Sequence, residues 1–216
     1  MFSSVKKRSS LCEKDIFGEI SKAVSLDDVV LIHSSFIAFS ELRHFDKWLI
    51  ARELKELLQP NRTILIPAFT FSSCKTGVFH RDLPSEVGQL ADVALEVREF
   101  SRSNHGIFSF AISGPRTNEI MNCNSNTSFG TGSVFHWLVE NNAKIVMAGC
   151  DWDKCTLYHH FEEVNEVPYR KSKIFEIFRG DDVEEVDFFV RCEDIKAVNN
   201  FDLINKKLHD DNLIVS

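Results

Sequence analysis

Four apolar runs, separated by segments of helical character, constrain the fold of this chain most. Val29–Ile32 is a continuous run of β-branched and aliphatic residues, typical of a strand buried on both faces, and Thr63–Ile66 is expected to be a second buried strand. Phe108–Ile112 and Lys144–Gly149 are expected to form two more. The clearest helix is Leu42–Leu58, where apolar residues recur at steps of three and four. Strands alternating with helices predict an α/β fold: a layered domain with a mostly parallel or mixed central sheet, flanked by helices on both faces.

The remaining elements are shorter or more polar. A helix is expected over residues 10–24, because Ser10–Glu13 has the S-x-x-E form of a capping box. Another begins at Pro84–Glu86, a third covers Val134–Val139, and a polar strand follows at Val186–Val190. No repeat, low-complexity tract or linker interrupts this order, so residues 1–216 are interpreted as one domain. In sheets of this kind, ligands sit outside the carboxyl ends of the strands.

Composition narrows the class of protein. The 216 residues are 44% hydrophobic and 26% charged, which is enough for a core of its own and excludes disordered and collagen-like chains. The net charge of −7 argues against a nucleic-acid binder, which would need positive charge for phosphates. No stretch approaches the roughly 18–20 apolar residues of a membrane span. The six cysteines show no C-x-x-C pair, so we expect reduced thiols in a cytoplasmic protein.

The negative charge is concentrated in the last third of the chain. Residues 1–150 hold 16 acidic and 16 basic side chains, whereas residues 151–216 hold 16 and 9. The densest part is the run of five carboxylates from Asp181 to Asp187. We expect it to be the solvated face of a hairpin, and therefore to say little about a substrate.

The densest cluster of titratable groups is Thr156–Glu163. If this segment is helical, His159 and Glu162 share a face, as do His160 and Glu163. A carboxylate beside an imidazole can fix its tautomer and raise its basicity, as a general base requires. The alternative is a surface helix with ordinary charges. A metal site is less well supported, because H-E-x-x-H is absent and H-x-x-E offers only two ligands, so no metal is expected.

Other catalytic motifs are weak or absent. Ser34 and Ser35 follow a strand, but no G-x-S-x-G elbow surrounds them. Gly130–Gly132 lacks the third glycine of a dinucleotide fingerprint, and there is no Walker A sequence. Hydroxyls and backbone N–H groups after the strands could still hold phosphates or pantetheine amides. Residue patterns alone therefore stop at an enzyme-like α/β domain with a candidate His/Glu site.

Six short signatures, in order along the chain, together resemble the aminoglycoside 3-N-acetyltransferase family. They are Val30–Ser35, Ile66–Thr70, Pro84–Gly88, Arg102–His105 leading to Ser109–Ala111, Phe129–Ser133, and Ala148–Cys150 continuing through T-x-x-H-x-x-E at Thr156–Glu162 to Val167–Arg170. Each is weak singly, but their order across roughly residues 10–170 is specific. The resemblance implies an acetyl-CoA-dependent N-acetyltransferase whose fold is unrelated to that of the commoner GNAT enzymes.

The resemblance also implies roles for particular residues. T-x-x-H-x-x-E places the catalytic histidine at His159 and the supporting acid at Glu162, a choice between His159 and His160 that spacing alone does not make. The positions that match the family's CoA site are His33, Ser34, Ser35, Arg102, Ser103, Ser109 and Phe110. For the two strand-end serines a capping turn is the alternative, and Arg102 could be an ordinary surface charge.

Two departures from the family affect the expected function. The chain ends at Ser216, tens of residues earlier than is usual in the family, which leaves open a truncated, inactive CoA-binding paralogue. The loop Phe71–Thr76 contains Lys75 and no carboxylate, whereas drug-modifying members tend to place acids there. The preferred hypothesis is therefore acetyl transfer to a nucleotide-linked amino sugar for surface polysaccharide synthesis. Aminoglycoside acetylation, which confers antibiotic resistance, is the alternative within the class, and a metal-dependent hydrolase is the alternative outside it. The oligomeric state is left open.

Overall fold

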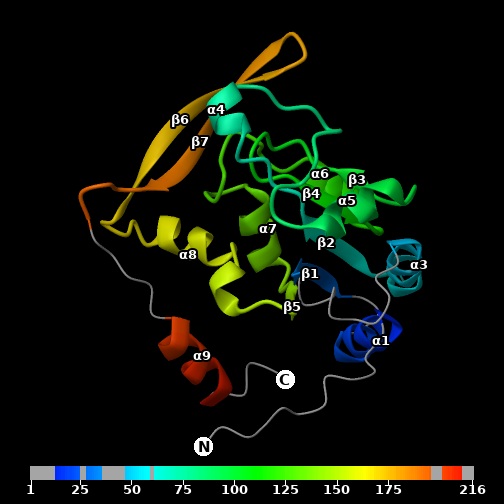
Figure 1. Ribbon diagram of the computed structural model, residues 1–216. Coiled ribbons are helices and arrows are strands. Elements are labelled where there is room, and N and C mark those ends of the chain that lie inside the picture. The colour runs from blue at the N-terminus through cyan, green and yellow to red at the C-terminus, as the bar shows by residue number, and fades with distance from the viewer. Residues whose placement is uncertain (1–12, 25–27, 36–46, 59–60, 196–200, 211–216) are drawn as a thin grey trace, which may run out of the picture.

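A mixed five-stranded sheet forms the centre of the molecule (Figure 1). The computed structural model describes residues 13–24, 28–35, 47–58, 61–195 and 201–210. The strands, in the order in which they lie, are β3 (Ser101–Arg102), β4 (Phe110–Ser113), β2 (Thr63–Pro67), β1 (Val29–Ser34) and β5 (Lys144–Ala148). β1 is parallel to both β2 and β5, whereas β4 is antiparallel to β2 and to β3. The predicted α/β class with a mixed sheet is confirmed.

Successive strand residues point to opposite faces of the sheet, and each face has its own core. Val30, Ile32, Ile64 and Ile66 belong to one apolar cluster, together with residues of α1 (Glu13–Ala23), α3 (Lys47–Leu57) and α5 (Gln89–Glu96). Val29, Leu31, Leu65 and Ile112 belong to the other, which includes α6 (Thr117–Met121) and α7 (Val134–Glu140). The uninterrupted apolar runs are explained by this arrangement, since both faces of the central strands are covered.

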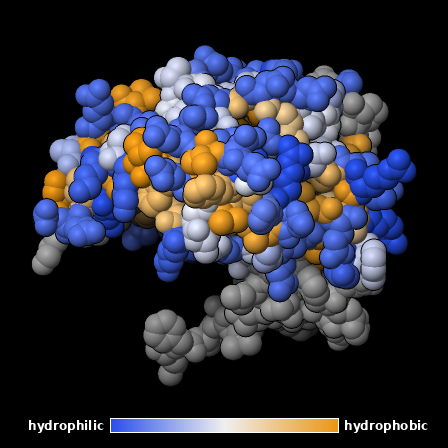
Figure 2. All heavy atoms as spheres, turned by 90° about the horizontal axis from the view of Figure 1, so that it is seen from above, coloured by the Kyte–Doolittle hydropathy of each residue, from blue (hydrophilic) through white to orange (hydrophobic). Residues whose placement is uncertain are grey.

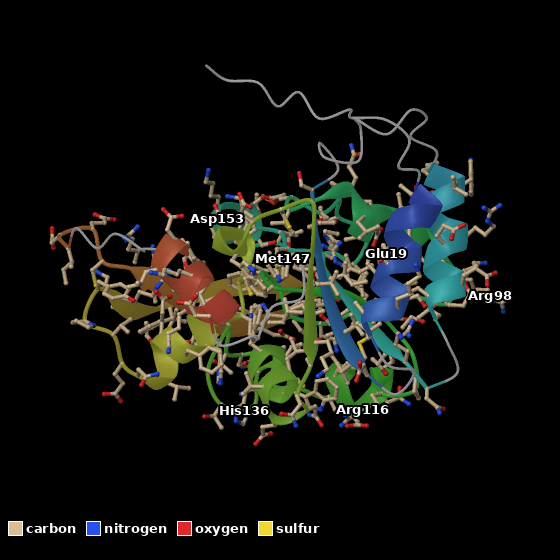
Figure 3. All side chains as sticks on the ribbon, turned by 90° about the horizontal axis from the view of Figure 1, so that it is seen from below. Glu19, Arg98, Arg116, His136, Met147 and Asp153 are labelled. Atoms are coloured by element: carbon tan, nitrogen blue, oxygen red, sulfur yellow. The ribbon has the colours of Figure 1, made fainter. Side chains whose placement is uncertain are left out.

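The helices of the two faces can be followed in the figures. α1 and α3 lie side by side in both ribbon views (Figures 1 and 3), on the side of the molecule that carries Glu19. Arg116 and His136, which belong to the α6 and α7 region, lie apart from them in Figure 3. Helices therefore cover both faces, as the sequence predicts. Seen from above, the surface is dominated by hydrophilic side chains with apolar ones scattered among them (Figure 2).

A long two-stranded hairpin extends from the helical layer and forms a sheet of its own (Figure 1). Its strands are β6 (Arg170–Arg179) and β7 (Asp182–Arg191), joined at Gly180, which has a positive φ of 63° that favours glycine. Ile177, Val186 and Phe189 bury one part of the hairpin against the second core. The sequence predicted only the part of β7 from Val186 to Val190, because β6 is rich in charged and exposed residues.

Several predicted boundaries are corrected by the structure. The helix expected from Pro84 begins only at Gln89, because the Glu86 N–H donates to the Phe69 carbonyl and the Ser85 N–H donates to the Asp92 carboxylate. The strand expected at residues 108–112 is β4, from Phe110 to Ser113. Ser10 and the first part of the helix predicted from Leu42 lie outside the described residues.

The short elements that follow β5 lead to the site. They are η1 (Trp152–Lys154) and α8 (Tyr158–Val164), and α9 (Phe201–Asp210) packs near η1. α4 (Ser73–Thr76) follows β2 and lies beside β6. Among the described residues, no helix is both long and apolar enough to cross a membrane.

Candidate active site

A cavity of about 940 Å³ opens at the carboxyl ends of the three parallel strands β2, β1 and β5. Its walls include Ile32–Ser35 at the end of β1, Ile66 and Pro67 at the end of β2, and Gly149–Asp151 after β5. The register pairs Ser34 with Ala148 and Leu31 with Leu65, so these strand ends lie side by side. The cavity occupies the place where open α/β sheets bind ligands.

His33 presents an unsatisfied polar atom to this cavity. Its side chain is 6% exposed, and burial lowers its pKa to about 4, so the imidazole is neutral at physiological pH. Among the described residues, its Nε2 has no hydrogen-bond partner although the atom is buried. Buried polar groups normally have partners, so His33 Nε2 is an available donor or acceptor for a bound molecule.

The first turn of α5 forms another part of the cavity wall. Gly88 to Ala91 line it, and the N–H groups of a first helical turn lack partners within the helix. Gly88 has a φ of 150° and its Cα faces the Ser34 carbonyl, which would lie 3.6 Å from an added Cβ. These N–H groups supply donors for anionic or carbonyl groups of a ligand.

His159 and Glu162 face each other on α8, three residues beyond the cavity-lining Thr156. The His159 Nδ1 lies 2.5 Å from Glu162 Oε2, and both side chains are largely buried. A carboxylate accepts only, so Nδ1–H is the donor and Nε2 is left with a free lone pair. Burial lowers the pKa of His159, the Glu162 carboxylate raises it, and the positive charge of Arg170 lowers it further. His159 is therefore poised as a neutral base.

Two residues at the start of the hairpin hold Glu162. Tyr169 donates from its hydroxyl to Glu162 Oε1 at 3.0 Å, and Arg170 Nε lies 2.7 Å from Oε2. The Arg170 contact is an ion pair rather than an aligned hydrogen bond, whereas its Nη1 donates to the Phe189 carbonyl at 3.0 Å. Both residues belong to the V-P-Y-R signature, which sequence reasoning recorded without assigning a role to either residue.

The loop before α7 packs on the same helix. The Phe129 ring contacts the His159 ring at 5.1 Å, and His160 Nδ1 donates to the Phe129 carbonyl at 2.6 Å. A Cβ at Gly130 would lie 2.6 Å from Glu163 Oε1, so this position has room only for glycine. His160 is thus a buried structural residue, whereas the smaller contact at His159 leaves its Nε2 edge usable.

Glu163 and Asp187 form an acidic pair beside this loop. Burial, and secondarily the charge of Asp187, raise the pKa of Glu163 to about 7. Asp187 Oδ2 accepts from Ser172 at 3.0 Å. Asp182 and Glu185 are exposed as the sequence predicts, but Asp187 is half-buried, so the expectation that the whole acidic run faces water is wrong at this residue. Its backbone hydrogen bonds to Asn126 and Ser128 draw it inward.

Arg102, Ser103, Ser109 and Phe110, which match the family's CoA site, are built into the scaffold. The Arg102 guanidinium donates to Ser109 Oγ and to the carbonyls of Ala68, Arg81 and Leu83. Ser103 Oγ accepts from the Phe110 N–H at 2.8 Å. All four residues are buried, and the residues that line the cavity in the described chain do not include them. Arg102 instead borders a second hollow of about 640 Å³ with Arg81 and Asp92. Only His33, Ser34 and Ser35 of the predicted set lie in the cavity wall.

Two further features concern chemistry of other kinds. Within the described residues, no group of three or more His, Cys, Asp or Glu side chains is arranged to hold a metal ion. Cys74, Cys123, Cys150, Cys155 and Cys192 carry free thiols.

The family of the chain follows from comparison with known proteins. Residues 31–216 match the family described as aminoglycoside 3-N-acetyltransferase. The chain belongs to this family. Its members are acetyl-CoA-dependent N-acetyltransferases, so acetyl-CoA is the cosubstrate. No match was found among curated proteins.

Solved structures share the fold of this family member. The apoenzyme of aminoglycoside acetyltransferase AAC(3)-IVa is 20% identical with a TM-score of 0.72, over 96% of this chain and 80% of that one. AAC-IIIb in a binary complex with CoASH is 19% identical with a TM-score of 0.74, over 94% and 86%. The YokD protein from Bacillus subtilis is 19% identical with a TM-score of 0.72, over 93% and 83%. The fold is that of these acetyltransferases and not the GNAT fold, as the sequence predicts.

Proposed function

We propose that this protein transfers the acetyl group of acetyl-CoA to an amine of an aminoglycoside-type amino sugar, with His159 as the general base. The observation that carries the proposal is the His159–Glu162 contact of 2.5 Å, three residues along the chain from Thr156 in the cavity wall. The family match supports the reaction class, and the imidazole geometry supplies the base that this class requires.

The cavity at the strand ends fits the cosubstrate. We assign His33, Ser34 and Ser35 to contacts with CoA, because they lie in the cavity wall and His33 Nε2 is buried without a partner in the described chain. The first turn of α5 supplies N–H donors on the neighbouring wall. Arg102, Ser103, Ser109 and Phe110 are proposed to hold β3 and β4 in place behind this site rather than to touch the ligand.

The chemistry requires a neutral amine. An ammonium group cannot attack a thioester, so His159 Nε2 takes up the amine proton, directly or through one water. Glu162 keeps Nδ1 protonated and stabilises the imidazolium that forms. Acetyl-CoA supplies an activated acyl carbon: the amine nitrogen bonds to it, the carbon–sulfur bond breaks, and the CoA thiolate leaves and takes up a proton.

The structure weakens the argument for a nucleotide-linked acceptor. That hypothesis depended on Lys75 and on the lack of carboxylates in the Phe71–Thr76 loop. Lys75 lies exposed on α4 and is not among the residues that line the cavity in the described chain. Glu86 reaches the same loop and accepts from the Ser72 N–H at 3.0 Å, and Asp151 and Asp153 lie in the cavity wall. A polycationic acceptor fits these carboxylates better.

Two solved relatives support the acceptor class. The structures of AAC(3)-IVa variants include complexes with a gentamicin and with apramycin. We place the reaction in the cytoplasm, and the free thiols in the described chain support a reducing compartment.

A direct test is to incubate the protein with acetyl-CoA and follow release of the CoA thiol. The panel contains gentamicin, apramycin and nucleotide-linked amino sugars, each with a no-acceptor control. We expect release with one or more aminoglycosides. Release with nucleotide-linked sugars alone would refute the acceptor class, and silence across the panel would favour an inactive CoA-binding protein.

A further inference from the structure

Arg170 is the one cation whose contact with Glu162 the described structure records, and it reaches the carboxylate from another element. Glu162 Oε2 lies between two groups, with His159 Nδ1 at 2.5 Å and Arg170 Nε at 2.7 Å. The Arg170 side chain is 12% exposed and that of Glu162 is 8% exposed. In such a poorly solvated place, charges act strongly on one another, so the state of each group depends on the other two.

The hairpin fixes Arg170 in this position. Arg170 is the first residue of β6, and its Nη1 donates to the Phe189 carbonyl of β7 at 3.0 Å. Phe189 is itself buried in the second core. The guanidinium is therefore held from the strand opposite while its Nε faces Glu162, which gives the hairpin a direct connection to α8.

We propose that Arg170 is a positioning residue for acetyl transfer, which neutralises Glu162 so that Glu162 orients the His159 imidazole without holding it in the protonated form. The proposal rests on the function proposed above for His159. A lone buried carboxylate beside an imidazole favours the imidazolium, which cannot act as a base. With Arg170 in place, the carboxylate stays ionised, accepts the Nδ1 hydrogen bond and leaves Nε2 unprotonated.

The other groups around His159 do not provide this compensation. Tyr169 donates to the other oxygen of Glu162 at 3.0 Å but carries no charge, and Tyr158 and Phe129 contact His159 through their rings. Glu163 on α8 and Asp187 on β7 are acidic and would favour the imidazolium. Arg191 pairs with Arg170 across the hairpin but is exposed. The direction in which Arg170 moves the pKa of His159 agrees with its place among these groups.

Arg170→Gln and Tyr169→Phe form a matched pair for testing. Each removes one contact with the same carboxylate, but only the first removes a charge. The readout is the NMR titration of the His159 ring in the protein alone, with its signal assigned by comparison with His159→Ala. In Arg170→Gln we expect the titration midpoint to rise by about one pH unit. In Tyr169→Phe and Arg170→Lys, where the cation remains, it should stay within about 0.5 of the wild type.

Turnover gives a second readout on the acceptor that the panel identifies. Arg170→Gln should lower kcat/KM about tenfold on the acidic limb of the pH profile and recover toward the wild-type value at alkaline pH. An unchanged His159 titration in Arg170→Gln, or an equal loss of rate at every pH, would overturn the proposal. So would a wild-type His159 that titrates above the ordinary value for histidine, a measurement that needs no variant to fold. If the titration moves but no acceptor is acetylated, the proposed function fails and the electrostatic role of Arg170 stands.

Discussion

Two buried arginines, Arg102 and Arg170, serve different purposes in this protein. Arg102 directs its guanidinium to three backbone carbonyls and one serine hydroxyl, so its donors are used within the fold. Arg170 pairs with a carboxylate that is itself bonded to an imidazole. The first network ends on backbone, and the second ends on His159, whose Nε2 remains available for chemistry.

The comparison shows which polar segments can form a site. Residue type and a position near a strand end are the same for both arginines, and both belong to segments that match the family. The partners differ: backbone partners indicate support, and side-chain partners that leave a titratable atom free indicate function. Four variants or pairs of variants test this distinction, beginning with the largest expected effect.

Replacing His159 with Ala should remove the base and leave the fold intact. We expect kcat to fall by about 10²–10⁴ because no other group in the described site can accept the amine proton in its place. Thiol release from acetyl-CoA measures the rate, and calorimetric titration with CoA measures whether the cavity is preserved. Full turnover in a folded His159→Ala protein would show that the α8 network is not catalytic.

Replacing Arg102 with Ala should have the opposite profile. The carbonyls of Ala68, Arg81 and Leu83 would lose their donor, and Arg102 is 3% exposed. We expect the free energy of unfolding to fall by about 3–5 kcal/mol, measured by urea denaturation. A variant of normal stability with a raised KM for acetyl-CoA would instead place Arg102 in the CoA site.

Glu163→Gln should stabilise the protein in a pH-dependent way. The pKa of Glu163 is about 7 in the folded protein, above its ordinary value of 4.5, so the folded state binds more protons than the unfolded state in this window. The wild type therefore loses stability as the pH rises from about 4.5 to about 7, and the variant does not. After allowance for the exposed part of the side chain, we expect a gain of about 1–2 kcal/mol at pH 8 and none at pH 4.5. An equal effect at both values would contradict the assigned pKa.

Ser34→Ala and Ser103→Ala compare the two segments directly. Ser34 lies in the cavity wall, so its loss should raise KM for acetyl-CoA by about threefold to tenfold with kcat nearly unchanged. Ser103 Oγ accepts from a backbone N–H, so its loss should lower stability by about 1 kcal/mol without raising KM. Steady-state kinetics with denaturation curves for both variants decides between these outcomes.

Much of the fold could be predicted because both faces of the sheet are covered. Val29–Ile32 and Thr63–Ile66 are apolar throughout, and burial on two faces is what such runs require. β6 could not be predicted, because only Ile177 among its residues is buried and its other positions face solvent at least in part. The start of α5 depends on contacts made by Ser85 and Glu86 with distant residues, which no local pattern contains.

The site was predictable to a similar extent. The spacing of His159 and Glu162 indicated a shared helix face, and the T-x-x-H-x-x-E resemblance selected His159 over His160. Arg102 could not be separated from Ser34 by sequence, since both are polar and both follow or form strands. The roles of Arg170, Gly130 and Asp187 depend on the packing of the hairpin and the preceding loop against α8, which is a tertiary property.

The most direct test of this account compares kcat and the thermal midpoint for His159→Ala and Arg102→Lys, measured side by side below both midpoints. We predict that His159→Ala keeps its midpoint and loses about 10²–10⁴ in kcat, whereas Arg102→Lys loses several degrees and keeps most of its kcat. If both variants lost turnover at normal stability, the two networks would belong to one site, and the distinction between a supporting and a catalytic network would be wrong.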